Sequence, residues 1–424
     1  MNPETSRLPR RLLLVTPDFP PDRIGGVGNH AEIVALQMRA AGLRVDVAAF
    51  TEGQAATCRD ERCGEDTVFY RRRGSPAVTN WHAWRFLRRH RGEYDLIHCL
   101  DNTLVAGGLL GRLRRRPPVV ASLNNLQAAC LNPEEDLRRQ CQACSPADSL
   151  RCAWRARRGP ARLMAGLYMW PAFLLARRLA RRCDRYIAIS EDIRRRYIRA
   201  GFPADRITTI PRWMDDRFYA RVETVVPAPK ALDRFRVLFV GQLGPRKGPQ
   251  DLLEAFIGLP PDLRDHSELV ILGRGTLGES LQARADQAGV AGQVQIRFCP
   301  YEALPSEYAA ADLFVHPARW PEPAGATRLE AMAFSLPILS SENPSAREIM
   351  GDDGALYYRA FDTDHLREQL VRLMRSPELR ERLGRAAHGR LRNHRTGDIV
   401  ARCLEVYAQA VASRIEGPAD PQPP

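Results

Sequence analysis

Two glutamates, Glu322 and Glu330, stand eight positions apart in a segment whose residue types could bind a phosphorylated sugar. Glu322 lies in a proline-rich stretch (WPEPAG), and a helix is expected to begin at Gly325 and to carry Glu330. Backbone N–H groups at a helix N-terminus bind anions, so those of Ala326 and Thr327 would hold a diphosphate. The two carboxylates would bracket it and accept hydrogen bonds from sugar hydroxyls. Because its neighbours are apolar, Glu330 is expected to be half-buried and to need a polar partner.

A second loop, Val240 to Gly248 (VGQLGPRKG), follows a strand-like run and precedes a helical one. It holds Lys247, one of two lysines among 63 basic residues. A lysine in a chain that otherwise uses arginine suggests a compact positive charge for a phosphate. A cation exposed on a loop is the alternative interpretation of Lys247.

A third loop, Gly25-Gly26-Val27-Gly28, also joins a strand-like run to a helical one. Gly26 and Gly28 would let the backbone approach a ligand closely. By itself this loop is a weak signal, because a glycine turn between a strand and a helix is structural as often as it is functional.

These loops need parallel sheets to position them, since ligands gather beyond the carboxyl ends of the strands in an open α/β sheet. Short apolar runs alternate with helical patterns from end to end, which predicts such sheets with crossover helices. The strands of a first sheet are expected at Arg11–Thr16, Val45–Phe50, Leu96–Cys99, Val119–Leu123, Tyr186–Ile189 and Ile207–Ile210. Those of a second sheet are expected at Arg236–Val240, Glu268–Leu272, Val294–Phe298, Leu313–His316 and Pro337–Ser340.

The fold class is therefore α/β, with two Rossmann-like domains in tandem. A chain of 424 residues is about the right length for two such domains. The expected boundaries are an N-terminal domain at 1–221 with a cysteine-rich insertion at about 124–160, a proline-rich linker at 222–233, a C-terminal domain at 234–397, a helix at 398–415 that would return to the N-terminal domain, and a disordered tail at 416–424.

The net charge of +13 is unevenly placed, because residues 1–220 hold 38 basic against 23 acidic side chains. A basic half suggests an anionic partner: a membrane surface, a phosphorylated lipid or a nucleic acid. A general bias toward arginine is the competing explanation. The basic runs lack interleaved aromatic residues, so a membrane is favoured and no nucleic-acid partner is expected. No apolar stretch predicts export or a membrane span, which favours a cytoplasmic protein.

The segment Arg162 to Arg182 places apolar residues among arginines. It could lie on an anionic membrane at the inner face of the cell membrane and bring a lipid-linked acceptor to the site. A helix that simply covers the N-terminal sheet is the alternative.

Taken together, these motifs resemble the GT-B nucleotide-sugar transferases, most closely the family 4 glycosyltransferases. The resemblance is most specific at Glu322 to Pro337, which is similar to the family's E-x7-E segment and "EAMAxGxP", and at Phe239 to Gly248, similar to "VGRLxxxKG". The GGVG loop, Cys183 to Asp192 and Asp205 to Phe218 support it.

The resemblance implies two domains that face each other across a cleft, and retaining transfer from a nucleotide-sugar without a catalytic metal. In this family, Glu330 would bind the donor's ribose, Glu322 the transferred sugar, and Lys247 the diphosphate. The amides near Gly325, Ala326 and Thr327 would assist Lys247. Gly241 would belong to the same donor site, while Gly26 and Gly28 would close on the β-phosphate and shape the acceptor site.

This chain departs from the family pattern at several positions. Gln242 stands where an arginine is usual, so a second phosphate cation is missing, and Arg246 is expected to replace it. On the acceptor side, His98 precedes Leu100 and Asp101 where a further histidine is common, and Asn124 replaces another histidine. His98 itself is interpreted as structural rather than catalytic, although we keep His98, Asp101 and Asn124 as acceptor-side candidates. In addition, Ser335 stands where a glycine is usual.

Four cysteines, Cys130, Cys141, Cys144 and Cys152, form a cluster in the N-terminal half. The Cys-x2-Cys pair with two outer thiolates could make a closed structural zinc site, and a similar insertion occurs in some family 4 members. Free thiols are the alternative.

The sequence therefore predicts a retaining transferase that moves a hexosyl-type sugar from a nucleotide-sugar to a carbohydrate or lipid-linked acceptor, in bacterial surface polysaccharide or glycolipid synthesis. No cofactor is expected for catalysis. One alternative is a nucleotide-sugar epimerase on the same fold. Another is a non-catalytic protein that binds sugar or nucleic acid.

Overall fold

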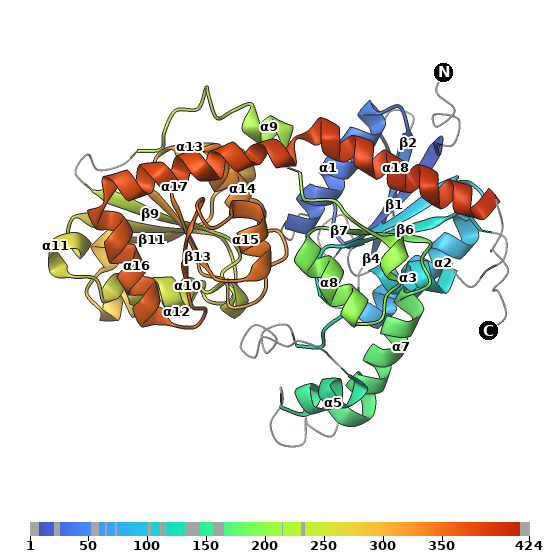
Figure 1. The fold of residues 1–424 in the computed structure, drawn as a ribbon, viewed down its shortest axis with the longest axis horizontal. Helices are drawn as coiled ribbons and strands as arrows, with labels where there is room; N and C mark the ends of the chain where they lie inside the picture. The colour runs from blue at the N-terminus through green and yellow to red at the C-terminus, as the bar shows by residue number, and fades with distance from the viewer. Residues whose placement is uncertain are drawn as a thin grey trace. The chain divides into compact units, whose positions relative to one another are not determined.

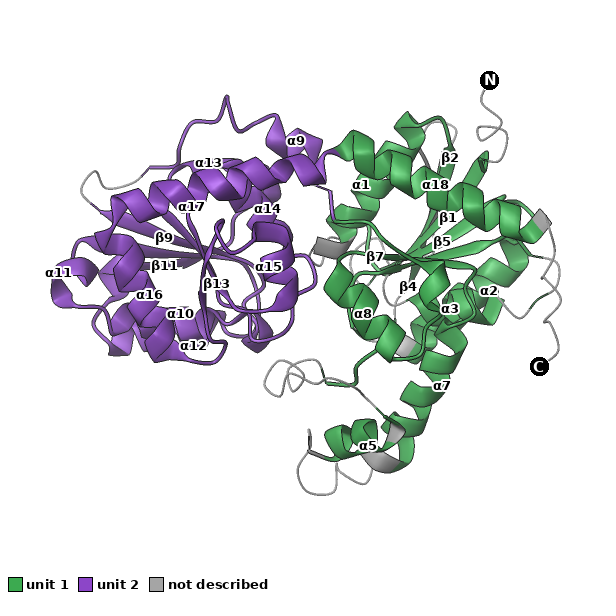
Figure 2. Ribbon diagram, viewed as in Figure 1, with its two compact units in different colours: residues 1–132, 142–211, 396–424 green, residues 133–141, 212–395 purple. Residues whose placement is uncertain are grey.

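The computed structural model forms two compact units, which Figure 2 shows in separate colours. Unit 1 comprises residues 1–132, 142–211 and 396–424, and unit 2 comprises residues 133–141 and 212–395. Three of the candidate residues, Asp101, Cys141 and Cys144, lie outside the described part of the chain. The structure describes residues 8–20, 26–51, 59–63, 66–72, 74–100, 103–110, 113, 116–126, 128–132, 145–155, 165–213, 215–229 and 234–415.

Unit 1 is built on an eight-stranded sheet in the order β3-β4-β2-β1-β5-β6-β7-β8 (Figure 1). All pairs are parallel except β3 with β4. All six expected strands are present within one or two residues. The strands are β1 (Arg11–Thr16), β2 (Arg44–Thr51), β3 (Arg59–Cys63), β4 (Asp66–Arg72), β5 (Leu96–Leu100), β6 (Val119–Leu123), β7 (Arg185–Ala188) and β8 (Ile207–Thr209).

The β3–β4 pair was not predicted from the sequence. Strand β3 reads RDERC, and a run with four charged residues gives no apolar signal for a strand. Charged residues are common on edge strands because they discourage pairing with other chains. Strand β4 buries Val68 and Tyr70 and attaches the hairpin to β2.

The helices of unit 1 cover its sheet, and one of them comes from the end of the chain. Residues 396–424 belong to unit 1, so the C-terminal helix α18 packs with the N-terminal sheet, where it contacts β6 and β7. Helix α3 packs so closely on α7 that a Cβ on Gly108 would lie 1.9 Å from the carbonyl oxygen of Leu179. The helices are α1 (Gly26–Ala40), α2 (Pro76–His90), α3 (Leu104–Leu110), α5 (Pro146–Arg155), a π-helical turn (Ala165–Met169), α7 (Trp170–Ala180), α8 (Glu191–Arg199) and α18 (Thr396–Ile415).

Unit 2 has a six-stranded parallel sheet in the order β11-β10-β9-β12-β13-β14. Its five expected strands are present, and the short β14 (LYY) was missed because three residues show no periodicity. The strands are β9 (Phe235–Val240), β10 (Ser267–Leu272), β11 (Val294–Arg297), β12 (Leu313–His316), β13 (Ile338–Ser341) and β14 (Leu356–Tyr358). The helices are α9 (Asp216–Tyr219), α10 (Pro249–Ile257), α11 (Pro261–Arg264), α12 (Gly278–Gln287), α13 (Leu304–Ala309), α14 (Ala326–Ala333), α15 (Pro344–Met350), α16 (Thr363–Arg375) and α17 (Pro377–Arg390).

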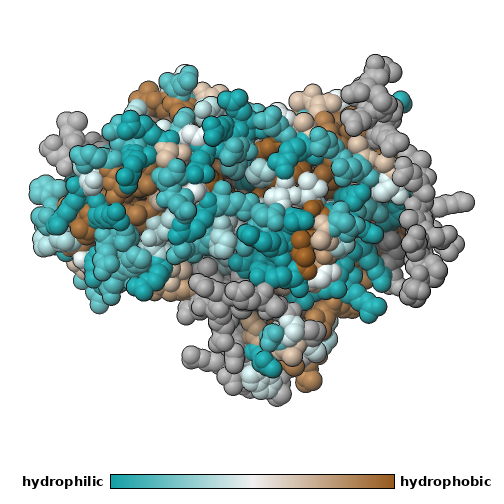
Figure 3. Space-filling view, in the orientation of Figure 1, coloured by the Kyte–Doolittle hydropathy of each residue, from teal (hydrophilic) through white to brown (hydrophobic). Residues whose placement is uncertain are grey.

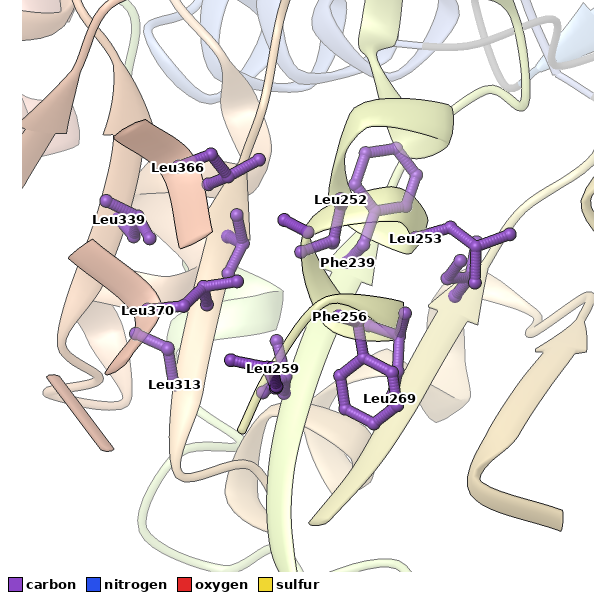
Figure 4. Packing of buried hydrophobic residues seen from close by; sticks show 14 of the residues in the cluster. Phe239, Leu252, Leu253, Phe256, Leu259, Leu269, Leu313, Leu339, Leu366 and Leu370 are labelled. Atoms are coloured by element: carbon purple, nitrogen blue, oxygen red, sulfur yellow. The ribbon is translucent and has the colours of Figure 1, made fainter. Parts of the chain in front are cut away.

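A core of leucine and phenylalanine side chains fixes the helices of unit 2 to its sheet (Figure 4). Leu252 and Phe256 of α10 lie over Phe239 of β9, and all three side chains are almost fully buried. Each such side chain contributes about 1.5–3 kcal/mol to folding by its burial. This packing holds the first turn of α10, and the loop before it, at the carboxyl end of β9.

The boundary between the units falls at Pro211 and Arg212, ten residues before the expected end of the N-terminal domain. The reason is the short helix α9, whose Phe218 is 2% exposed in the core of unit 2. The Phe218 ring lies 5.9 Å from that of Tyr308 and 6.1 Å from that of Phe334. Further along, the N–H of Ala228 donates to the carbonyl oxygen of Ser306 (2.9 Å). The segment 212–229 therefore packs with unit 2.

Candidate functional site

The loops that follow β9 and β12 meet at the carboxyl end of the unit 2 sheet. Gly248, between the single 3₁₀ turn at Pro245–Lys247 and α10, has a φ of 73°. A Cβ on Gly248 would lie 1.8 Å from the carbonyl oxygen of Pro317, which follows β12. In addition, the N–H of Arg319 donates to the carbonyl oxygen of Arg246 (2.8 Å). Glycine at position 248 is thus required both for its backbone conformation and for the close approach of the two loops.

This approach brings Lys247 to Glu322, although 75 residues separate them in the sequence. Lys247 Nζ donates to Glu322 Oε1 at 2.5 Å and also lies 5.9 Å from the centre of the Trp320 ring. The Glu322 residue is only 8% exposed. Burial alone would raise the pKa of this carboxyl, but Lys247, His316 and Arg328 outweigh it and hold the pKa well below its ordinary value. Glu322 is therefore an ionised acceptor in a nearly dry site.

His316, at the end of β12, lies next to the second oxygen of the Glu322 carboxylate. Its Nε2 lies 3.2 Å from Glu322 Oε2, and its Nδ1 lies 3.0 Å from Nη2 of Arg328. A guanidinium can only donate, so Nδ1 must be the acceptor and Nε2 must carry the proton. Burial and the Arg328 charge lower the pKa of His316 to about 4, so the ring is neutral near pH 7. The ring therefore carries its N–H on Nε2, the nitrogen that lies nearest to Glu322.

Neither His316 nor Arg328 was identified from the sequence as part of the site. His316 was assigned only to the end of a strand, and Arg328 was one arginine among 61. The position of Arg328 between the two glutamates, on a helix with otherwise apolar neighbours, was the one available signal. It could have indicated a buried cation.

The other half of the site is the start of α14. Gly325 has a φ of 54°, a conformation that favours glycine, and the helix begins at Ala326. Ala326 and Thr327 are half-buried and lie in the first turn, where backbone N–H groups have no acceptor within the helix. The glycine, the amides and Glu322 are thus within one short segment at the sheet edge, as the sequence predicted.

Glu330 lies further along α14 and is 6% exposed. The hydroxyl of Tyr308, on α13, donates to Glu330 Oε2 at 2.8 Å, which supplies the partner that the sequence required. Burial raises the pKa of Glu330 to about 7, although the Tyr308 hydrogen bond and the Arg212 charge oppose the shift. This carboxyl therefore changes its charge near neutral pH.

A fourth loop, after β10, lies beside the loop after β9 at the carboxyl end of the sheet, and it was not predicted from the sequence. A Cβ on Gly273 would lie 1.8 Å from the carbonyl oxygen of Gly241, and one on Gly275 would lie 2.4 Å from that of Leu243. The N–H of Leu243 donates to the carbonyl oxygen of Arg274 (2.9 Å). Gly241 therefore lies where two loop backbones are in contact. The motif Gly-Arg-Gly directly after a strand was the available signal.

The acceptor-side candidates lie in unit 1. Gly26 begins α1, and a Cβ on Gly28 in its first turn would come within 3.0 Å of Asp18 Oδ2. Asn124 follows β6 directly and is half-buried. His98 is 2% exposed, and both of its ring nitrogens are engaged: Nδ1 lies 2.7 Å from the hydroxyl of Tyr407, and Nε2 lies 2.8 Å from Ser122 Oγ. These contacts support the structural interpretation of His98.

The cysteine cluster is described only in part. Cys130 follows the loop after β6 and Cys152 lies on α5, whereas Cys141 and Cys144 are outside the described residues. Within the described ranges, no group of three or more His, Cys, Asp or Glu side chains could hold a metal ion. The zinc site stays a prediction.

Both units match models of known protein families. Residues 24–218 match the model described as Glycosyltransferase Family 4, and residues 223–390 match the model described as Glycosyl transferases group 1.

Curated relatives match about half of the chain. The O-antigen chain mannosyltransferase B of Escherichia coli is 28% identical over 204 residues, which are 46% of this chain and 52% of that protein. The GDP-mannose-dependent alpha-(1-6)-phosphatidylinositol monomannoside mannosyltransferase of Mycolicibacterium smegmatis is 32% identical over 197 residues, which are 42% of this chain and 49% of that protein. The chain therefore spans about half the length of these relatives.

Among solved structures, Anabaena Alr3699/HepE in complex with UDP is similar with a TM-score of 0.66 and 20% sequence identity. The match covers 94% of this chain and 100% of that one.

Proposed function

The chain belongs to the glycosyltransferases of the GT-B, family 4 type, and on that premise we propose that it moves a hexosyl-type sugar from a nucleotide-sugar donor to a carbohydrate or lipid-linked acceptor. The observation that carries the proposal is the contact of Lys247 with Glu322 beside the first turn of α14. A cation, two buried acids and the backbone amides at the start of α14 lie at the carboxyl end of the unit 2 sheet. This is the chemistry that a sugar bound to a diphosphate requires.

Each residue has a distinct role in the proposed donor complex. The ammonium of Lys247 and the amides of Ala326 and Thr327 would bind the diphosphate, with Gly325 allowing its close approach. Glu322, whose Oε2 lies 3.2 Å from His316 Nε2, would accept hydrogen bonds from hydroxyls of the transferred sugar. Glu330 lies on α14, about one turn after Ala326, and would accept the ribose hydroxyls. Unit 2 would thus contact the diphosphate, the sugar and the ribose of the donor.

The reaction we propose retains the configuration at the anomeric carbon. The bond between that carbon and the diphosphate oxygen breaks, and its electron pair leaves with the diphosphate. The acceptor hydroxyl then attacks from the same face, and its proton passes to the departing phosphate oxygen. Lys247 and the helix amides stabilise the charge that develops on the leaving group, so the proposal requires no catalytic metal.

Two relatives suggest the class of acceptor. The matched proteins are named as an O-antigen chain mannosyltransferase and a phosphatidylinositol monomannoside mannosyltransferase. The first name refers to a polysaccharide chain and the second to a glycolipid. We propose that this chain acts in the synthesis of a bacterial surface polysaccharide or glycolipid. Gly26 and Gly28 of unit 1 would then help to shape the acceptor site.

A lipid-linked acceptor would be reached most easily from a membrane surface, and one part of unit 1 suits that surface. The lobe that contains α5 and α7 exposes large apolar side chains (Figure 3). Leu167 is 78% exposed, Tyr168 68% and Leu175 58%, and Arg178 is exposed on the same helix as Leu175. Apolar and aromatic residues beside arginine favour the interface of an anionic bilayer. No helix in the described ranges has the length and apolar character needed to cross a membrane. From the exposed apolar residues of this lobe we propose that the enzyme acts peripherally, at the inner face of the cell membrane.

Flotation with liposomes tests the membrane proposal. The protein should float with vesicles that contain an anionic phospholipid and should stay unbound with neutral phosphatidylcholine vesicles. A double substitution, Leu167→Ser with Leu175→Ser, should reduce the bound fraction several-fold at unchanged donor affinity. Equal flotation of wild type and variant would mean that this lobe is only a cover for the N-terminal sheet.

A structural zinc ion held by Cys130, Cys141, Cys144 and Cys152 remains part of the proposal. Four thiolates form a closed tetrahedral site that suits zinc. Metal analysis after reducing, chelator-free purification should find about one zinc per chain. A value below about 0.2 per chain would favour free thiols.

A thermal-shift panel of nucleotides and nucleotide-sugars is the most direct test of the proposed function. One nucleoside diphosphate and its sugar conjugates should raise the Tm, and the corresponding donor should be hydrolysed or consumed when an acceptor is added. Interconversion of free nucleotide-sugars would instead indicate the alternative, an epimerase on the same fold. Salt-sensitive binding to DNA without any nucleotide response would indicate a non-catalytic binding protein.

A further inference from the structure

Arg328 is a fully buried arginine directly beneath the first turn of α14. Its exposed fraction is 0%. The side chain folds back toward the start of its own helix, so that Nη1 lies 3.1 Å from the position that a Cβ on Gly325 would occupy. Nη2 donates to His316 Nδ1 at 3.0 Å. The Nε and Nη1 groups are buried and have no hydrogen-bond partner among the described residues.

The charges of this cluster do not cancel. Lys247 and Arg328 are cations, His316 is neutral, and Glu322 is the carboxylate whose charge favours the ionised form of Arg328. That same carboxylate is already in contact with Lys247 at 2.5 Å. One positive charge therefore remains in a site shielded from water. Burial of an unpaired charge is costly, so the cluster is arranged for an anion that is not part of the chain.

A change of partners follows when a diphosphate enters. If Lys247 turns from Glu322 to the phosphate, Oε1 of Glu322 becomes available to a sugar hydroxyl. Oε2 stays at 3.2 Å from His316, whose tautomer Arg328 fixes. The carboxylate can then exchange one partner without losing its orientation, because the contact through His316 does not depend on Lys247.

We infer that Arg328 is the second cation of the donor site and that, through His316, it positions Glu322 while Lys247 moves from Glu322 to the donor diphosphate. The inference rests on the proposed function, because it takes the anion to be the diphosphate of a nucleotide-sugar. It replaces our expectation that Arg246 supplies the missing charge. The side chain of Arg246 is exposed, where water and salt screen its charge, whereas Arg328 acts from within the protein.

The experiment compares four substitutions with the wild-type protein. Arg328→Met removes the charge at similar length, and Arg328→Lys keeps a charge but loses the planar fork that meets His316. His316→Phe removes the contact with Glu322 and leaves the cations in place. Arg385→Met is the matched control, since this arginine is 72% exposed on α17. For each protein, we measure the Tm without ligand, the affinity for inorganic pyrophosphate, UDP and GDP, and the kcat and KM for the donor that the wild type uses.

Arg328→Met should weaken pyrophosphate and nucleoside diphosphate binding at least about tenfold while the ligand-free Tm stays the same or rises, since an uncompensated charge has been removed. A merely structural arginine would give the opposite result: a lower Tm with unchanged affinity. Arg328→Lys should recover part of the affinity. His316→Phe should lower kcat at least about tenfold with diphosphate affinity within about twofold, because it affects positioning but not charge.

Two outcomes would overturn the inference and leave the proposed function intact. One is an Arg328→Met protein that binds diphosphates as the wild type does. The other is a His316→Phe protein with wild-type kcat. If Arg328→Met does not fold, Arg328→Lys and His316→Phe decide the question. Wild-type diphosphate affinity in Arg328→Lys together with wild-type kcat in His316→Phe would contradict the inference. A wild-type protein that binds neither pyrophosphate nor either nucleotide would instead refute the proposed function itself, and the inference with it.

Discussion

Two buried histidines occupy corresponding strands of the two sheets. His98 lies on β5, next to β1, and His316 lies on β12, next to β9, so each belongs to the strand beside the first strand of its domain. The side chains of both are almost fully buried, and both ring nitrogens of each have a polar neighbour. Nevertheless, the surroundings of the two rings have opposite character.

His98 has neutral partners, the hydroxyls of Tyr407 and Ser122, and burial alone lowers its pKa to about 3. His316 lies between a guanidinium and a carboxylate, and its pKa, lowered by burial and by Arg328, is about 4. Residue type and burial are thus the same, and the charges of the partners differ. The neutral partners of His98 make it part of the packing, whereas the partners of His316 are charged and belong to a cluster with a surplus of positive charge, which is the basis of the proposed donor site.

The largest expected effect comes from Glu322, the acid that His316 orients. Glu322→Gln removes the charge that accepts from Lys247, and turnover of the donor should fall about 10²- to 10³-fold. Steady-state kinetics, normalised to the folded fraction from circular dichroism, measures the change. Glu381→Gln, at a side chain that is 66% exposed, is the control and should have no effect. Retention of more than half the activity would show that the charged cluster of unit 2 is not the reaction site.

Lys247→Ala comes next. The loss of a charge-assisted contact should weaken a bound nucleoside diphosphate by about 2 kcal/mol, roughly thirtyfold in Kd, and leave the nucleoside unaffected. Isothermal titration calorimetry measures both ligands. The chain's other lysine provides the control, because Lys230→Ala should bind as the wild type does. Equal losses of affinity for the nucleoside and for the nucleoside diphosphate would rule out a phosphate-binding role for Lys247.

Glu330 tests whether unit 2 holds a carboxyl whose charged form is disfavoured by burial. Its folded pKa of about 7 lies above the ordinary value of 4.5, so its neutral form stabilises the fold below pH 4.5 and that stability is lost as the pH rises through 7. Glu330→Gln removes this dependence. As the pH rises from 4.5 to 8, the free energy of unfolding of the wild type should fall by up to about 3 kcal/mol relative to that of the variant. Urea titrations at the two pH values measure the difference, and parallel pH profiles would contradict it.

Tyr407→Phe probes the neutral histidine of unit 1. Removal of the hydroxyl leaves Nδ1 of His98 buried without that partner, which should cost about 1–2 kcal/mol of stability. The kcat should stay within twofold of the wild type, in contrast to His316→Phe. Denaturant unfolding and kinetics on the same preparation separate the two effects. A large fall in kcat at unchanged stability would make His98 a catalytic candidate again.

The smallest expected effect concerns the backbone at the end of the site helix α14. Ser335 has a φ of 53°, a left-handed conformation that favours glycine, and it stands where the resemblance expects a glycine. Ser335→Gly should therefore raise the free energy of unfolding by about 0.5–1 kcal/mol. Gly289, with a φ of 69° and no atom within 4 Å of the position that a Cβ would occupy, gives the reverse test. Gly289→Ala should lose a similar amount, and no change in either variant would contradict the backbone argument.

The sequence was sufficient for much of the fold. Eleven strands were predicted and are present, because alternating apolar runs and helical patterns are local properties of the chain. The hairpin strands β3 and β4 and the short β14 were missed, since strands rich in charged residues and strands of three residues are defined by their neighbours. The packing of Phe218 with unit 2 could not be predicted for a similar reason: rings from distant segments bury it, which no local pattern shows.

For the site, the sequence identified residues, while the tertiary structure decided their relations. Glu322, Glu330 and Lys247 could be selected because their types and spacing are unusual in this chain. Their charge states and partners could not, since a pKa depends on burial and on groups far away in the sequence. The Lys247–Glu322 contact spans 75 residues, and it exists because a glycine at position 248 lets two loop backbones approach. Local chemistry thus determined which side chains could react. Packing decided which of them are in contact and the protonation state of each.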